Sequence, residues 1–242
     1  MLWLGSYRLR IMKPVAKTSH ITDLETEISM RVEALHEKRT AAIRSLRKEY
    51  SRRLNDTPAE TVLELSRRLM ERSGAIYRFF AAELIHHHNE AFRRVDAGEV
   101  ERLGKGMASW GDVDMFAYYL SGPAWRNRQI PDRVVAGWAR DQSIWWRRAA
   151  LVSTVPLNSK AHGGTGDTVR TLKICRLLVD DREDMVVKAL SWALRELGKR
   201  DPTAVKEFMS EFDKRIAARV KREVNNKLTT GLKNPRQVRV IS

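Results

Sequence analysis

Two residues one helical turn apart, Trp110 and Asp114, could together stabilise a positive charge. Residues i and i+4 are neighbours on a helix, so the indole and the carboxylate would share one side. Two later segments add aromatic and basic side chains, Trp145-Trp-Arg-Arg-Ala-Ala150 and Lys188-Ala-Leu-Ser-Trp-Ala-Leu-Arg-Glu196. An acid beside aromatic faces in a very basic chain suits a reaction that passes through a cationic sugar intermediate on a polyanion.

Asp114 is the acid of this stretch that requires a special explanation. Asp112 falls at the expected start of a helix, where the helix dipole favours a carboxylate. Asp114 lies between Val113 and Met115 in mid-helix, so it is not a cap. An acid among apolar neighbours is usually paired with a basic side chain. Arg147 and Arg148 are the candidate partners.

The expected helix at 183–199 carries a second tryptophan in an unusual position. Its apolar stripe predicts a buried face made by Val186, Ala189, Leu190, Ala193, Leu194 and Leu197. Beside that face, Lys188, Trp192, Arg195 and Lys199 recur at spacings of four, three and four. Phosphate-binding cations around an aromatic platform would explain this second stripe. A half-buried tryptophan under snorkelling cations explains it equally well.

Other candidate sites have weaker support. His86, His87 and His88 are consecutive, so on a helix their side chains point about 100° apart and cannot chelate one ion together. No metal or cofactor site is expected. Cys175 lies in an apolar helix and is expected in the core. The glycine-rich loop 158–166 matches neither a Walker A loop nor a dinucleotide fingerprint, and its glycines predict flexibility.

Composition favours a polyanionic partner. The 242 residues include 45 Lys+Arg and 30 Asp+Glu, a net charge of +15, which suits nucleic acid or an anionic membrane surface. A merely solvated basic surface is the alternative. No apolar run has the length of a membrane span, so no membrane partner is expected. Residues 1–20 read as a poorly ordered leader without signal-peptide order, which predicts a cytoplasmic protein, nucleoid-associated in a bacterium. An organelle presequence stays open.

Helix signals recur along the chain, and strand signals are almost absent. Expected caps are Thr57 in a capping box with Glu60, then Ser143, Asp181 and Asp201. Ser121-Gly-Pro123 is expected to end one helix. The expected helices are 21–54 with a break near 37–40, 58–72, 75–88, 99–103, 112–120, 131–140, 143–155, 168–179, 183–199 and 202–220.

This series predicts an all-α fold. Short connections between helices of similar length suit an α-solenoid of degenerate HEAT-like antiparallel helix pairs. Periodicity alone leaves a compact irregular bundle equally open. We expect a single domain over residues 21–220. Residues 221–242 read as a basic C-terminal tail, either an arm that touches DNA or a solvated end.

At these motifs the sequence resembles the AlkD-type DNA alkylation repair proteins, which are HEAT-like DNA glycosylases. The likeness spans roughly residues 22–215. It is carried by Trp110-x-x-x-Asp114-Met, Ile144-Trp-Trp-Arg-Arg-Ala-Ala150 and Lys188 to Glu196, followed by Asp201-Pro. The resemblance favours the solenoid over the bundle and implies a concave basic face.

The resemblance also implies roles for individual residues. Asp114 matches the catalytic carboxylate, Trp110 and Trp192 the aromatic walls, and Arg148 the active-site arginine. The expected DNA-binding cations are Arg147, Lys188, Arg195 and Lys199. Arg148 would either hold a backbone phosphate or lower the pKa of Asp114 so that it stays ionised.

The implied activity is monofunctional, hydrolytic excision of N3- or N7-alkylated purines from duplex DNA during base excision repair, by a monomer. A positively charged purine is a good leaving group, and its departure leaves an oxocarbenium-like sugar, which Asp114 would stabilise while it orients water. The alternative is a non-catalytic HEAT-repeat module that binds duplex DNA or structured RNA. A scaffold for an acidic protein is a third interpretation.

Overall fold

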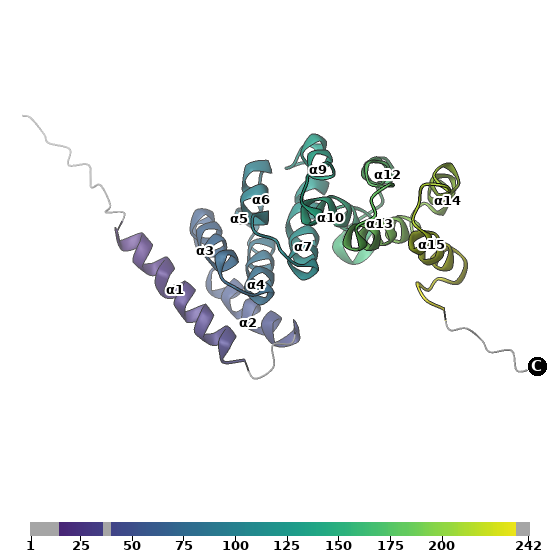
Figure 1. Ribbon diagram of the computed structural model, residues 1–242. Helices are drawn as coiled ribbons and strands as arrows, with labels where there is room; N and C mark the ends of the chain where they lie inside the picture. Colours follow the sequence, from purple (N-terminus) through teal and green to yellow (C-terminus); the bar gives the residue numbers. More distant parts are fainter. Residues whose placement is uncertain (1–14, 36–39, 236–242) are drawn as a thin grey trace, which may run out of the picture.

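The computed structural model describes residues 15–35 and 40–235, and within those ranges every regular element is a helix. The all-α prediction is therefore confirmed. The elements, shown in Figure 1, are α1 (Val15–Glu33), α2 (Thr40–Arg53), α3 (Ala59–Glu71), α4 (Ala75–His86), α5 (Asn89–Arg93), α6 (Ala97–Gly104), α7 (Trp110–Phe116), η1 (Ala117–Ser121), α8 (Gly122–Arg126), α9 (Asp132–Trp138), α10 (Ile144–Val152), α11 (Val155–Asn158), η2 (Lys160–His162), α12 (Thr168–Leu177), α13 (Asp184–Leu197), α14 (Pro202–Glu211) and α15 (Ala218–Thr230).

The helices form two rows along an elongated molecule (Figure 1). The lower row in Figure 1, which we call the front row, contains α2, α4, α7, α10, α13 and α15, and each of these helices packs against the next. The upper row, which we call the back row, contains α3, α5, α6, α9, α12 and α14, and α1 packs on α3 at the N-terminal end. Each repeat therefore contacts mainly its neighbours, which is the arrangement of an α-solenoid.

The core lies between the two rows and follows the helical periodicity of the sequence. On α13 the predicted apolar stripe is buried, from Val186 through Ala193 to Leu197. On α1, Leu24, Ile28 and Val32 are likewise buried at spacings of four. Burial of such stripes supplies most of the stability of helices of this length. No described helix is long and apolar enough to cross a membrane.

The helix that begins with α7 does not end at Ser121-Gly-Pro123, contrary to the sequence prediction. It continues through the π-helical turn η1 into α8 and ends at Arg126. Pro123 has no amide hydrogen to donate to the carbonyl of Tyr119, four residues earlier, and its ring would crowd that carbonyl in a regular helix. The wider turn accommodates the proline, and Gly122 donates instead to Ala117.

The carbonyl of Tyr119 that Pro123 leaves free is used by α4. The imidazole Nδ1 of His86 lies 2.8 Å from this oxygen. Because a carbonyl can only accept, Nδ1 carries the hydrogen. This hydrogen bond joins the irregular turn to α4, the preceding helix of the front row.

The glycine-rich segment 158–166 is a compact, hydrogen-bonded turn rather than the flexible loop that its glycines predict. Gly164 donates to the carbonyl of Ser159 at 2.8 Å and Gly166 to that of Leu157 at 3.0 Å. A Cβ on Gly164 would lie 2.4 Å from the carbonyl oxygen of Pro156, so only glycine permits this backbone approach. The buried Asn158 closes the turn by accepting from the amide of Asp167.

The two ends of the chain also differ from the predicted helices. The helix expected at 202–220 is two helices, α14 and α15, and α15 extends to Thr230 and packs against α13. The expected domain boundary at residue 220 therefore falls within a helix. At the other end α1 begins at Val15, inside the expected leader, and residues 1–14 lie outside the described residues, as do 36–39 of the expected helix break.

The predicted caps have mixed outcomes. Ser143 caps α10 and Asp201 caps α14, as expected. The capping box at Thr57 is wrong, because α3 begins after Pro58 without a side-chain cap. Asp181 accepts from the amide of Glu183, just ahead of α13, instead of capping the helix itself.

The close packing at Gly122 provides a test of the irregular helix. A Cβ at this position would lie 2.7 Å from both the Ala117 carbonyl oxygen and the Pro156 side chain. We expect Gly122→Ala to lower the free energy of unfolding by about 1–3 kcal/mol through overpacking. Urea denaturation measures the loss. The matched control is Gly137→Ala in α9, where a Cβ meets nothing within 4 Å, and it should be neutral or stabilising. Equal destabilisation by both variants would contradict this account.

Candidate active site

Asp114 and Arg148 form a buried ion pair between α7 and α10. Arg148 donates from Nε to one carboxylate oxygen at 3.0 Å and from Nη2 to the other at 2.9 Å. Both residues are buried, at 8% and 6% exposure. This two-point geometry is the strong form of an arginine–carboxylate interaction, and it confirms the prediction that Asp114 needs a basic partner.

The same guanidinium reaches a third helix. Nη1 of Arg148 donates to the carbonyl of Met185, in the first turn of α13, at 2.7 Å. Arg148 therefore ties together α7, α10 and α13, three consecutive helices of the front row. All three nitrogens of the guanidinium already donate to an acceptor, so a phosphate would have to compete with these acceptors for Arg148.

Burial is the largest influence on the pKa of Asp114. Removal from water raises the pKa of this carboxyl above the ordinary aspartate value, while the charge and hydrogen bonds of Arg148 act in the opposite direction. Arg148 acts on this pKa in the direction that the sequence-based expectation gave, and burial, the larger cause, outweighs it.

Several of the expected site residues line one cavity of about 270 Å³ beside this ion pair. Trp110, Arg148, Lys188, Trp192 and Arg195 converge there from α7, α10 and α13. Met185 and Lys233 complete the lining. Trp110 is 60% exposed, so an indole face is open to a ligand at the edge of the cavity.

Three other expected residues do not line this cavity. Asp114 lies behind Arg148 and reaches the cavity only through it. Arg147 forms an ion pair with Asp181 at 2.7 Å and donates to two backbone carbonyls. Lys199 pairs with Glu196 at 2.7 Å, two turns beyond Trp192. The stripe on α13 thus contributes its first three members to the cavity.

The charged residues that line the cavity are all basic: Arg148, Lys188, Arg195 and Lys233. Lys188 is held by Asp184 at 2.7 Å, and Lys233 lies 3.5 Å from Glu223. Arg195 donates to the hydroxyl of Ser191 and forms no ion pair among the described residues. Burial lowers its pKa, although a guanidinium stays charged. The cavity is suited to an anionic ligand with a flat or apolar part.

An aromatic pair supports Trp192 from the side of α7. The ring of Tyr118, in η1, lies 6.0 Å from the indole at an angle of 32°. The ring of His162, from the glycine-rich turn, lies 3.8 Å from that of Tyr118. The compact turn at 158–166 therefore contributes to the position of Trp192 through Tyr118.

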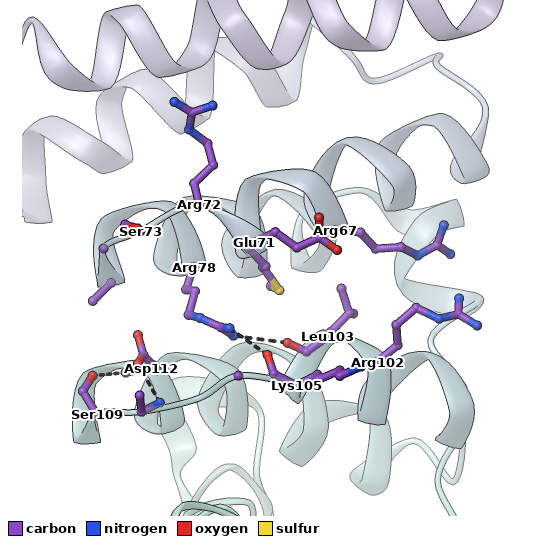
Figure 2. Close-up of a pocket in the computed structure, with 15 residues that line it drawn as sticks. Arg67, Glu71, Arg72, Ser73, Arg78, Arg102, Leu103, Lys105, Ser109 and Asp112 are labelled. Atoms are coloured by element: carbon purple, nitrogen blue, oxygen red, sulfur yellow. Dashed lines mark hydrogen bonds between the residues drawn. The ribbon is translucent and has the colours of Figure 1, made fainter.

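A larger cavity of about 860 Å³ lies at the start of α7, between the α3–α4 and α6–α7 connections (Figure 2). Arg78 reaches across it and donates to the carbonyls of Leu103 and Lys105. Of its other arginines, Arg67 and Arg102 are both paired with the buried Glu99. Arg78 thereby supports the connection that leads to α7.

The start of α7 is fixed by a reciprocal cap at the rim of that larger cavity. Ser109 accepts from the amide of Asp112, and Asp112 accepts from the amide of Ala108. Asp112 therefore has the helix-start role that the sequence predicts. Trp110 is the first residue after Ser109, so its backbone position is fixed by these two bonds from backbone amides to side-chain oxygens.

Sequence reasoning missed Lys233, Met185 and Tyr118. Lys233 stood in a range expected to be a tail, and only the packing of α15 on α13 brings it to the cavity. Met185 acts through its carbonyl, which no side-chain pattern reveals. Tyr118 could have been suspected, because it is two turns after Trp110 on the same helix, but its contact depends on the π-helical turn.

The histidine run has separate structural roles. His86 binds the Tyr119 carbonyl, and His88 accepts from the amide of Ala91 at the start of α5. The described residues contain no group of three side chains able to hold a metal ion. Cys175 is fully buried, as expected of a core residue, and burial raises its thiol pKa.

Comparison with known proteins identifies the family. The family model described as DNA alkylation repair enzyme matches residues 32–228, a range that includes α7, α10 and α13. No curated protein sequence matches the chain. The match covers most of the chain, and DNA is the substrate that the family's description implies. The chain belongs to the DNA alkylation repair enzyme family.

Proposed function

We propose that this protein is a monofunctional DNA glycosylase that hydrolytically excises positively charged N3- or N7-alkylated purines from duplex DNA. The observation that carries the proposal is the convergence of Trp110, Trp192 and Arg148 on a basic cavity directly in front of the buried Asp114. The enzyme would act as a monomer, without a metal or cofactor.

The chemistry follows from the charges of substrate and site. An alkylated purine leaves readily because it carries a positive charge, and the sugar then develops oxocarbenium character. The two indoles would stabilise that cation and exclude water from it. Asp114 would supply the negative charge and orient the attacking water. Arg148, Lys188, Arg195 and Lys233 would bind the phosphates on either side.

Arg148 gives a physical reason for coupling DNA binding to catalysis. In the free protein both carboxylate oxygens of Asp114 are bonded to this guanidinium. A backbone phosphate at the cavity would compete for Arg148, since both acceptors are anions that suit its planar donors. Release of one carboxylate oxygen would then expose it to the sugar. A phosphate that binds Arg148 would therefore also free Asp114 for catalysis.

The same ion pair favours a second candidate function. Asp114 does not line the cavity, and its two oxygens are satisfied internally. If the pair never opens, Asp114 is architectural, and the protein is a DNA-binding helical-repeat module without excision activity. The two functions share the basic cavity and differ in the fate of this carboxylate.

The first test removes the charge of Asp114. We expect Asp114→Asn to abolish release of 7-methylguanine or 3-methyladenine from methylated duplex DNA while duplex binding is retained. Loss of a buried partner also destabilises by about 3–5 kcal/mol, so folding is checked by circular dichroism at the assay temperature.

The matched control for this test is Glu99→Gln, which breaks another buried carboxylate–arginine cluster, none of whose members lines the cavity that contains Arg148. It should lose stability and keep base release. Undiminished release by the folded Asp114→Asn variant would show that Asp114 is architectural, and no release by the wild-type protein would favour the binding module.

The pH dependence of excision tests the state of the carboxylate. Catalysis needs ionised Asp114, and burial raises the pKa of this carboxyl. Activity should therefore fall on acidification at a pH above the ordinary aspartate range. Arg148→Lys removes the two-point hydrogen bonds that oppose the rise, so the acid limb of kcat/KM should move to higher pH. An acid limb that is identical in both proteins would assign it to another group.

The cations of α13 provide a graded test of DNA binding. Lys188→Gln and Arg195→Gln should each weaken duplex binding and reduce the dependence of log K on log salt by about 0.9, the value for one phosphate neutralised by one cation. Lys199→Gln should have a smaller effect, because this lysine, although paired with an acid as Lys188 is, lies outside the cavity. Fluorescence anisotropy across a salt series measures the slopes. The reverse ranking would place the DNA path along the far end of α13.

A further inference from the structure

A second basic depression lies far from the candidate active site, where α2 and α4 end. It encloses about 670 Å³ and is lined by Arg47, Lys48 and Arg52 from α2 and by His87 at the end of α4. Asp56 is its one acidic lining residue, and that carboxylate accepts from the side-chain amide of Asn55. Its lining residues come from the first two helices of the front row and from the residues that follow them.

The side chains of two of its cations are not held by an ion pair in the described part of the protein. Lys48 and Arg52 are exposed, and their side chains make no ion pair or hydrogen bond among the described residues, although the charge of Arg52 acts on the nearby Glu49. They are four residues apart on α2, so their side chains are neighbours and repel one another. An anion bound between them would turn that repulsion into attraction.

The third cation is held in place beneath them. Arg47 is buried and donates to Glu83 at 3.1 Å and to the hydroxyl of Ser51 at 3.3 Å. Glu83 also binds Arg44, so one carboxylate serves two guanidinium groups. The cluster of Arg44, Arg47 and Glu83 therefore carries a net positive charge, which belongs to the half-exposed Arg44, because the buried Arg47 and Glu83 balance one another.

His87 reports the resulting electrostatic potential. Burial is the first cause that lowers its pKa, and the positive charges of Arg47, His86 and Lys48 lower it further, against the opposing charge of Glu83. The pKa of His87 is about 4. The imidazole is neutral at physiological pH, although a bound anion would favour its protonated form.

We propose that this depression binds a phosphodiester of the DNA backbone and anchors the duplex at a distance from the excised base. Lys48 and Arg52 would hold the phosphate oxygens, and His87 would donate to them when protonated. The inference takes DNA as the ligand from the proposed function, and it does not require excision. It assigns a role to residues that neither the catalytic cavity nor the core uses.

The helix packing gives the spacing between the two sites. From α4 to α13 the front row makes three steps, through α7 and α10. Packed helices lie 8–10 Å apart, which gives a separation on the order of 25–30 Å. B-form DNA rises about 3.4 Å per base pair, so the anchor would contact the backbone about eight base pairs from the lesion.

Binding of an unmodified duplex tests the anchor without reference to catalysis. We expect the double variant Lys48→Gln/Arg52→Gln to lower duplex affinity and to reduce the slope of log K against log salt by about 0.9 for each phosphate that is no longer neutralised. The matched control is Lys206→Gln/Lys214→Gln, which removes two exposed lysines, unpaired among the described residues, from the region of α14 in the back row. Equal losses in the two double variants would mean non-specific attraction and overturn the proposal.

Duplex length sharpens the test. On duplexes that extend only about five base pairs to each side of the bound centre, the anchor is out of reach, so the double variant should bind as tightly as the wild type. A difference that persists unchanged on such short duplexes would contradict the proposed spacing.

Nuclear magnetic resonance of the His87 imidazole identifies the ligand, with His87→Gln to assign the signal. A long duplex should raise the pKa of His87 in the wild type and change it little in the double variant. Inorganic phosphate alone is the second arm. A response to phosphate and none to the duplex would define a small-anion site and overturn the proposal.

These outcomes separate the anchor from the proposed activity. If the wild type releases no alkylated purine but the double variant and the His87 titration behave as expected, the glycosylase proposal fails and the anchor stands. If the wild type excises alkylated purines and the double variant has an unchanged salt slope, the anchor alone fails.

Discussion

The contact on which the candidate site depends is the guanidinium of Arg148. It binds Asp114 on α7 through two hydrogen bonds and the Met185 carbonyl on α13 through a third, while its own backbone belongs to α10. A solenoid gains its stability from neighbouring helices, so a side chain that joins three of them fixes their relative register. The two tryptophans stand on the first and last of these helices. Their separation is therefore set by the residue that also controls the carboxylate.

A second set of contacts links the candidate site to the N-terminal helices of the front row. Pro123 forces a π-helical turn, the turn frees the carbonyl of Tyr119, and His86 of α4 binds it. The hydroxyl of Tyr119 accepts from Arg44 of α2, which shares Glu83 with Arg47. The adjacent Tyr118 supports Trp192. Through Tyr118 and Tyr119, the π-helical turn that follows α7 thus contacts α2, α4 and α13.

The sequence was informative where a residue's environment depends on its own helix, and uninformative where it depends on a distant partner. Asp114 could be selected because a carboxylate in mid-helix demands a partner, and the stripe on α13 could be placed by periodicity alone. The π-helical turn could not, because the proline that causes it normally ends a helix. The glycine-rich turn was misjudged for a related reason: glycine permits flexibility, but here it permits a backbone approach that only a folded neighbour creates. Lys233 reaches the site through the packing of α15, which a fading apolar pattern did not predict.

Composition alone overstates the surface available to DNA. Many of the arginines behind the net charge of +15 are committed to the fold: Arg147 to Asp181, Arg67 and Arg102 to Glu99, and Arg78 to backbone carbonyls. Such groups are costly to recruit, because a phosphate must replace an existing partner and leave a buried acceptor unpaired. Cations without an acidic partner among the described residues, such as Lys48, Arg52 and Arg195, carry no such penalty. Arg148 lies between these classes, because it is committed to Asp114 and also lines the cavity. When a phosphate displaces the internal partner of Arg148, the group released is the Asp114 carboxylate, which the proposed reaction needs.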